Sequence, residues 1–175
     1  QLMTSGSYKN TLWKTDGTSS GTVQLSNLDV IDEQSGVDFG MTQQSIYIYN
    51  QSQKTFFKSN YQPGGSSVIS QNLAYNQFNN FYNFKNTLWF SSGIALFGSD
   101  GFEPWRCDGF QTVKTFDIYQ GVAGSAPFGY FEINNDLYFF ANNGGGVKLY
   151  KFNGDFTFNN SVNNNWSNGL NWNAG

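Results

Sequence analysis

Short runs of large apolar side chains, separated by turn-forming residues, recur along the chain. Three of these runs, at 45–49, 87–90 and 136–140, carry apolar residues at consecutive positions and do not alternate with polar ones. A strand with one wet face alternates apolar and polar residues, so consecutive apolar residues indicate strands that are buried on both faces. No stretch keeps the 3.6-residue apolar period of a helix. The pattern therefore predicts an all-β protein.

One local arrangement occurs four times: an aromatic residue, then a basic residue, and an Asp or Asn three positions after the aromatic one. The segments are 12–17, 56–60, 104–109 and 149–154. Their turn residues stand at positions 16, 60, 108 and 153, which are 44, 48 and 45 residues apart. A period of about 45 residues made of strands predicts one four-stranded antiparallel blade of a β-propeller per repeat. Because a blade lies between two others, this fold also accounts for strands that are apolar on both faces.

Each turn residue opens a predicted hairpin. Asp-Gly and Asn-Gly tolerate positive φ and are strong hairpin signals, and strands return after the turns at 22–25 and 112–116. In the second repeat Tyr61 stands where the others have glycine, and a longer Gln-Pro-Gly-Gly loop precedes Val68 and Ile69. We expect the second repeat to form the same hairpin with a longer loop.

The amino-acid composition also favours β-strands, and the charge and apolar runs exclude nucleic acid and a membrane span. Aromatic residues make up 19% of the 175 residues and charged residues 12%, a mixture that favours pleated, packed strands. The net charge is −3 and the nine Lys and Arg residues form no cluster, so nucleic acid is excluded as a partner. No apolar run reaches the roughly 20 residues that span a bilayer, so we do not expect the chain to be membrane-spanning.

The sequence lacks the residues that most catalytic mechanisms need. The chain has no histidine, and its one cysteine is Cys107. These counts exclude His-dependent triads, His-based zinc sites and thiolate metal clusters, and they leave Cys107 without a histidine to activate it. Residues 144–146 are a lone glycine run, which we interpret as a loop and not as a phosphate cradle. We expect no catalytic, cofactor-binding or metal-binding residues.

Acidic residues leave two alternatives open. A glycosidase needs two carboxyl groups about 5–9 Å apart, and the candidate pairs are Asp100 with Glu103 and Asp32 with Glu33. Asp100, Glu103 and Asp108 also offer oxygen ligands for calcium, although without the spacing of an EF-hand. Acidic residues this close together in loops commonly cap turns or face solvent, and we favour that interpretation.

The tryptophans also have two interpretations. Exposed rings stack on sugars, whereas buried rings pack one blade against the next. Trp13 and Trp105 hold the same position in their repeats, and Trp89 lies in a predicted inner strand. These positions favour packing between blades over sugar binding.

Two of the repeats resemble a known bacterial repeat family. Residues 12–23, LWKTDGTSSGTV, are similar to the ELWKTDGTxxGTxxVKDI repeats of bacterial β-propellers, and residues 101–118 resemble a second copy that lacks two turn residues. Residues 134–142 resemble the family's NGxLYFxA strand. The resemblance covers 8–156, loosely in the second repeat, and implies propeller blades in a large exported protein. The family offers no catalytic residues to carry over.

The last residues differ from the repeats. Residues 159–175 are rich in Asn, and their Trp166-Ser167-Asn168 and Asn171-Trp172 resemble the WNNGxNW segments of Bacteroidetes surface proteins. This resemblance implies export by the type IX secretion route and a further module that begins here, and the alternative is an Asn-rich linker. We therefore divide the chain into propeller repeats at 1–158 and a linker or module start at 159–175.

Together these observations predict a non-enzymatic, extracellular β-propeller module of a large secreted or cell-surface protein, acting in adhesion or ligand binding. The expected partner is a protein, including secretion machinery that carries the chain as cargo, or a glycan. No cofactor is expected, with calcium as the open alternative. The alternative function is a carbohydrate-active enzyme or lectin that uses carboxylates and aromatic rings in the propeller channel. Four repeats would suffice for a four-bladed ring, but the chain begins inside a repeat, which favours a larger ring of roughly six to eight blades.

Overall fold

The computed structural model describes residues 10–27, 38–70, 77–93 and 101–152. This part of the chain consists of strands, turns and loops and contains no helix. It accordingly has no helix with the length and apolar character needed to cross a membrane. The prediction of an all-β protein is confirmed.

Thirteen short strands make up the regular structure of the described residues. In chain order they are β1 (Trp13–Lys14), β2 (Val23–Gln24), β3 (Asp38–Met41), β4 (Ile46–Asn50), β5 (Thr55–Ser59), β6 (Ser66–Ser70), β7 (Gln77–Phe84), β8 (Thr87–Gly93), β9 (Glu103–Cys107), β10 (Thr112–Lys114), β11 (Phe128–Ile133), β12 (Asp136–Asn142) and β13 (Val147–Phe152). The three strands predicted from consecutive apolar residues are β4, β8 and β12. The strands predicted to return after the turns are β2, β6 and β10.

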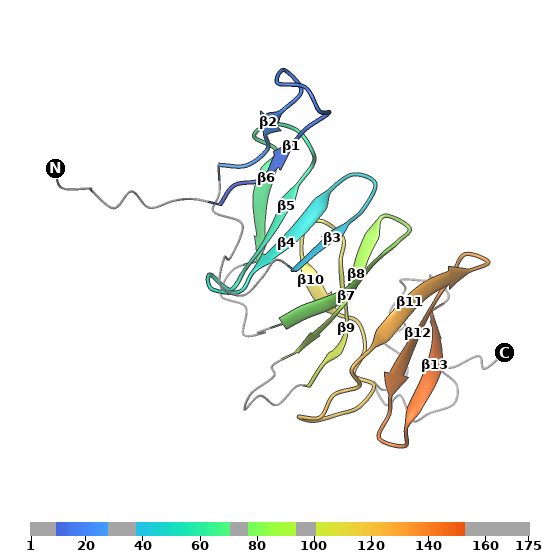
Figure 1. Cartoon of the computed structure of the whole chain (residues 1–175). Coiled ribbons are helices and arrows are strands. Elements are labelled where there is room, and N and C mark those ends of the chain that lie inside the picture. The colour runs from blue at the N-terminus through green and yellow to red at the C-terminus, as the bar shows by residue number, and fades with distance from the viewer. Residues whose placement is uncertain (1–9, 28–37, 71–76, 94–100, 153–175) are drawn as a thin grey trace.

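The strands form four antiparallel sheets, and every pairing joins strands that are neighbours in the sequence. The first sheet consists of β1 and β2, the second of β3 to β6, the third of β7 to β10 and the fourth of β11 to β13. Figure 1 shows the sheets following one another across the molecule in chain order, from the blue β1–β2 hairpin to the orange strands of the fourth sheet. A four-stranded meander is therefore complete in two of the repeats.

Each inner sheet packs one face on the sheet before it, which we call its trailing face, and the other on the sheet after it, its leading face. Between the second and third sheets, Tyr49 and Phe56 of the leading face lie in one cluster with Phe78, Phe90 and Trp105 of the trailing face. The ring centroids of Tyr49 and Phe78 are 4.1 Å apart. Burial of large aromatic rings from water is the main stabilising contribution of this layer.

The same arrangement recurs on either side of this layer. Between the third and fourth sheets, Trp89 of the leading face packs with Phe139 and Phe152 of the trailing face, and the centroids of Trp89 and Phe152 are 4.8 Å apart. A smaller cluster joins Leu12, directly before β1, to Phe57 on the trailing face of the second sheet. Apolar layers, rich in aromatic rings between the last three sheets, thus connect all four sheets in series.

The first strands of the last three sheets lie side by side, because β3 contacts β7 and β7 contacts β11. Gly40 of β3 comes so close to the third sheet that a Cβ atom there would lie 2.7 Å from a methyl carbon of Leu88 and 2.9 Å from the side chain of Phe81. The sheets therefore meet along their first strands, and β6 and β10 form the opposite edges of the two complete sheets.

Burial on both faces occurs where a sheet has neighbours on both sides. In β4 and β8 every position after the first is buried, as the consecutive apolar residues predict. In β12, Leu137 and Phe139 on the trailing face are buried, whereas Tyr138 and Phe140 on the leading face are half-buried. The prediction of two buried faces is wrong for β12, because no sheet in the described residues covers the leading face of the fourth sheet.

The tryptophans divide in the same way. Trp89 and Trp105 are 0% and 7% exposed, which confirms that they pack between sheets. Trp13 is 54% exposed, so the packing prediction is wrong for this residue. Leu12 and Lys14 turn toward the second sheet, and side chains alternate along a strand. Trp13 therefore lies on the trailing face of the first sheet, which no described sheet covers.

Candidate functional site

The repeated Asp or Asn closes the tip of three equivalent hairpins, β1–β2, β5–β6 and β9–β10. The Oδ1 atoms of Asp16, Asn60 and Asp108 accept a hydrogen bond from the backbone N–H two residues later, at 2.9, 3.2 and 2.9 Å. Such a bond is the Asx turn that favours these residue types in loops. The residue after each of them has positive φ: Gly17 at 91°, Tyr61 at 63° and Gly109 at 95°. The second repeat therefore keeps the tip geometry although Tyr61 replaces glycine.

In the first two repeats, the lysine of the motif joins its repeat to the next one. Lys14 Nζ donates to the carbonyl oxygen of Tyr61 at 2.9 Å, and Lys58 Nζ donates to the carbonyl oxygen of Gly109 at 3.4 Å. Tyr61 and Gly109 both follow the turn Asn or Asp of the next repeat, so the two bonds are equivalent. The repeat pattern marks these lysines, but sequence reasoning missed what they bind because the acceptor lies slightly more than one repeat further along the chain.

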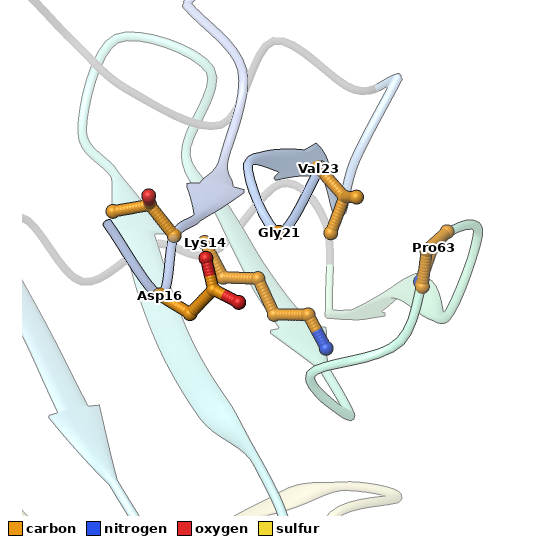
Figure 2. Close-up of a pocket in the computed structure, with 6 residues that line it drawn as sticks. Lys14, Asp16, Gly21, Val23 and Pro63 are labelled. Carbon is orange, nitrogen blue, oxygen red and sulfur yellow. The ribbon is translucent and has the colours of Figure 1, made fainter. Parts of the chain in front are cut away.

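An open pocket of about 510 Å³ lies where the first two hairpins meet. Its lining residues are Lys14, Thr15, Asp16, Gly21, Val23 and Pro63. Figure 2 shows the Lys14 side chain extending from β1 between the hairpin and the loop that carries Pro63. The pocket thus presents one cation and one carboxylate at the edge of the molecule, where a polar group of a ligand has access to both.

Both charged groups of this pocket already have protein partners. Lys14 donates to the Tyr61 carbonyl, and the Asp16 carboxylate accepts hydrogen bonds from the hydroxyl and the N–H of Thr18, at 2.7 and 2.9 Å. These bonds lower the pKa of Asp16. The carboxylate folds over Gly21, where a Cβ atom would lie 2.0 Å from the Asp16 Cγ. The bonds that shape the hairpin therefore also hold the pocket's charges in place.

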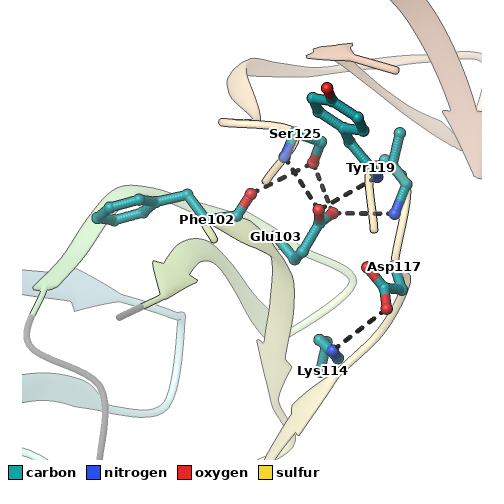
Figure 3. Close-up of polar contacts among 7 residues, drawn as sticks. Phe102, Glu103, Lys114, Asp117, Tyr119 and Ser125 are labelled. Atoms are coloured by element: carbon teal, nitrogen blue, oxygen red, sulfur yellow. Dashed lines mark hydrogen bonds and ion pairs between the residues drawn. The ribbon is translucent and has the colours of Figure 1, made fainter. Parts of the chain in front are cut away.

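Glu103 is a buried carboxylate at the start of β9, with 1% of its surface exposed. Its Oε1 accepts hydrogen bonds from the N–H groups of Ser125 and Tyr119 at 2.9 and 3.2 Å. Its Oε2 accepts from the Ser125 hydroxyl and the Ile118 N–H at 2.6 and 3.0 Å. Figure 3 shows these donors surrounding the carboxylate from one loop. Glu103 therefore fastens the segment 118–125 to the third sheet.

Burial raises the pKa of Glu103, and the hydrogen bonds from Ser125, Ile118 and Tyr119 oppose this rise. Because both carboxylate oxygens are used by backbone and hydroxyl donors, the arrangement favours an anchoring role for the side chain. Of the acidic residues named from the sequence as its catalytic or metal-binding partners, Asp108 shapes a hairpin tip, where its Oδ1 also accepts from the Gln111 N–H at 3.2 Å. Asp100 lies outside the described residues, as does the second candidate pair, Asp32 with Glu33.

In the part of the chain that the structure describes, no three His, Cys, Asp or Glu side chains gather in a group able to hold a metal ion. The glycine run at 144–146 lies in the loop between β12 and β13, as predicted, and the Asn142 side chain accepts hydrogen bonds from the N–H groups of Gly144 and Gly146. Trp166 and Trp172 lie outside the described residues.

Cys107 is fully buried at the end of β9, and its sulfur accepts a hydrogen bond from the Gly109 N–H at 3.4 Å. Burial raises the pKa of the thiol to about 11. A thiol reacts as its thiolate, so we expect no reaction with Ellman's reagent at neutral pH in the native protein and one thiol per chain after denaturation. Rapid labelling of the native protein would contradict this burial.

Comparisons of the chain with protein-family models, with curated proteins and with solved structures found no match. The protein is therefore classified from its own architecture. It is an all-β repeat protein in which antiparallel meanders pack face to face in series. Side-chain bridges from Lys14 and Lys58 tie successive hairpin tips together along one edge.

Proposed function

We propose that the chain is a β-propeller module of an extracellular or cell-surface protein and that it acts by binding, not by catalysis. The observation that carries this proposal is the contact of β3 with β7 and of β7 with β11, which are the first strands of consecutive meanders. In a propeller, four-stranded blades pack around a central channel, so equivalent strands of successive blades are neighbours. The aromatic layers between the sheets support the same arrangement.

The binding surface in this proposal is the edge formed by the hairpin tips β1–β2, β5–β6 and β9–β10. Loops on a rigid scaffold are the usual carriers of binding function. At the third tip, Phe110 is 83% exposed and its ring centroid lies 5.5 Å from Lys58 Nζ. An exposed aromatic ring beside a cation suits contact with a protein or a glycan.

A non-catalytic role is supported by the state of Glu103, whose oxygens are both occupied in a buried site. The competing proposal, a carbohydrate-active enzyme, requires two carboxyl groups that face a substrate. The resemblance of 12–23 and 101–118 to exported bacterial repeats supports a location outside the cell. It also supports delivery as cargo of a secretion system such as the type IX route.

The test combines binding and turnover. The purified chain is applied to arrays of immobilised glycans and extracellular matrix proteins, and the same glycans are assayed for released reducing sugar. We expect binding without product, and binding at least about tenfold weaker for Phe110→Ala, because the loss of one exposed anchor residue commonly has this effect. Val122→Ala is the matched control, since Val122 is 73% exposed on a different loop. Release of sugar, absence of binding, or equal binding by Phe110→Ala contradicts the proposal.

A further inference from the structure

The leading face of the fourth sheet is a continuous apolar surface. Its apolar side chains are Phe128, Phe131, Ile133, Tyr138, Phe140, Val147 and Leu149, and Asp136, Asn142 and Lys151 lie on the same face, as the pairing of β11 and β13 with β12 shows. Phe128 and Leu149 are 45% and 54% exposed. The rings form stacked pairs, with centroids 5.5 Å apart in Phe131–Tyr138 and 5.6 Å apart in Phe128–Phe140. A surface of this kind marks an interaction site.

The register of the strands identifies what this face corresponds to. Tyr138 pairs with Lys151 as Trp89 pairs with Arg106 and as Tyr47 pairs with Lys58. Tyr47 and Trp89 belong to leading faces, and both are buried by the sheet that follows. The exposed face of the fourth sheet is therefore one half of an interface that the molecule already builds between its own sheets.

The other half is exposed at the opposite end of the series. Trp13, 54% exposed, holds the position that Phe57 and Trp105 hold in the next two hairpins, and those two residues are buried on trailing faces. In the hairpins of Phe57 and Trp105, the residue after the turn Asn or Asp also accepts a hydrogen bond from the preceding repeat's lysine. The equivalent acceptor of the first hairpin is the carbonyl of Gly17.

Lys151 supplies the matching donor. It is the fourth basic residue of the motif, in the position of Lys14 and Lys58, and it lies on the exposed leading face beside Tyr138. In place of a hairpin carbonyl, Lys151 Nζ contacts Asp136 of its own sheet at 2.8 Å. One end of the series thus presents an apolar face and a lysine donor, and the other end presents the exposed Trp13 ring and the Gly17 carbonyl.

We propose that the leading face of the fourth sheet binds the β1–β2 hairpin of a second copy of this chain, head to tail. Trp13 of the second copy packs on the face formed by Phe128, Tyr138 and Leu149, and Lys151 donates to the Gly17 carbonyl of the second copy. Such a heterologous contact closes into a ring or extends into a filament, depending on the rotation between copies. The proposal is independent of the ligand-binding proposal, because it concerns neither Phe110 nor the hairpin edge.

The first test is the oligomeric state of the full chain by sedimentation velocity from about 1 μM to about 1 mM. We expect species heavier than the 19.6 kDa monomer, with a population that rises with concentration. Leu149→Asp and Trp13→Asp are each expected to weaken association at least about tenfold, because each places a charge in an apolar contact. Phe128→Asp is the second variant on the same face, should Leu149→Asp not fold, and Val122→Asp is the exposed aliphatic control that should assemble like the wild type.

The decisive arm is a mixture of the two end variants. Leu149→Asp keeps an intact first hairpin and Trp13→Asp keeps an intact fourth sheet, so their equimolar mixture should form a dimer although neither variant does so alone. Lys151→Gln should weaken association about fivefold through the lost hydrogen bond. A monomeric wild type, a Trp13→Asp variant that still dimerises through two fourth sheets, or a mixture that stays monomeric overturns the proposal.

Discussion

Replacement of Trp89 by alanine is expected to lower the free energy of unfolding by about 3–5 kcal/mol, the usual cost of truncating a buried tryptophan. The side chain is 0% exposed between the third and fourth sheets. Its ring centroid lies 4.8 Å from that of Phe152 and 6.5 Å from that of Phe116. Because Phe152 is held by β13 in the fourth sheet, the cavity cannot close fully. Urea denaturation followed by far-UV circular dichroism measures the loss.

Two matched variants show whether burial causes this loss. Trp89→Phe should cost less than about 2 kcal/mol, because the indole Nε1 has no hydrogen-bond partner among the described residues and its removal relieves an unpaired buried donor. Trp13→Ala should change stability by less than about 0.5 kcal/mol, since Trp13 is 54% exposed. The comparison is made at a concentration at which the chain is monomeric. Equal losses for Trp89→Ala and Trp13→Ala would contradict the sheet packing described above.

Replacement of Glu103 by alanine is expected to lower the free energy of unfolding by about 3–5 kcal/mol. The substitution leaves the N–H groups of Ile118, Tyr119 and Ser125 without the carboxylate that now accepts their hydrogen bonds. The same change should release the segment that Glu103 fastens to β9. Hydrogen exchange at these three amides should therefore accelerate more than exchange in the second sheet. Uniform acceleration, or none, would exclude a local anchoring role.

Glu103→Gln keeps the shape of the side chain but turns one acceptor into a donor that faces a backbone N–H. Its loss in free energy of unfolding should therefore lie between zero and that of Glu103→Ala.

The stability that Glu103 contributes should depend on pH. Burial raises the folded-state pKa of Glu103 above the ordinary 4.5, so the folded protein holds the carboxyl proton more tightly than the unfolded chain does. The stability from this group is greatest below pH 4.5 and falls as the pH rises through the folded pKa. The difference in free energy of unfolding between the wild type and Glu103→Gln should therefore decrease as the pH rises through the folded-state pKa of Glu103. An increase over this range would contradict a raised pKa.

The motif residues show how far local reasoning reaches. Asp16, Asn60 and Asp108 were predicted to form turns, and their side chains accept the hydrogen bonds that make those turns. This succeeds because an Asx turn involves only residues that follow one another. The lysines beside the first two motif aromatics are equally visible in the sequence, yet the acceptor lies 47 residues away for Lys14 and 51 for Lys58. Only the packing of neighbouring hairpins shows that pairing.

The role of Glu103 could not be predicted from the sequence. In the sequence, Glu103 lies close to Asp100, and this pair of acidic residues suggested glycoside hydrolysis or calcium binding as alternative roles. The structure places its side chain inside a loop whose donors come from 15, 16 and 22 residues downstream. Irregular loops have no periodic pattern that predicts their backbone direction, so the donors could not be assigned beforehand.

The all-β class, the positions of the hairpins and the strands rich in apolar residues could be predicted from the sequence. These properties follow from side-chain alternation and turn chemistry over a few neighbouring residues. Sequence reasoning could not predict which of two equivalent tryptophans is buried, since Trp105 has a sheet before it and Trp13 has none among the described residues. Whether a side chain on a sheet face is buried depends on the sheet that packs against that face. That sheet comes from a different repeat, so the local sequence does not show it.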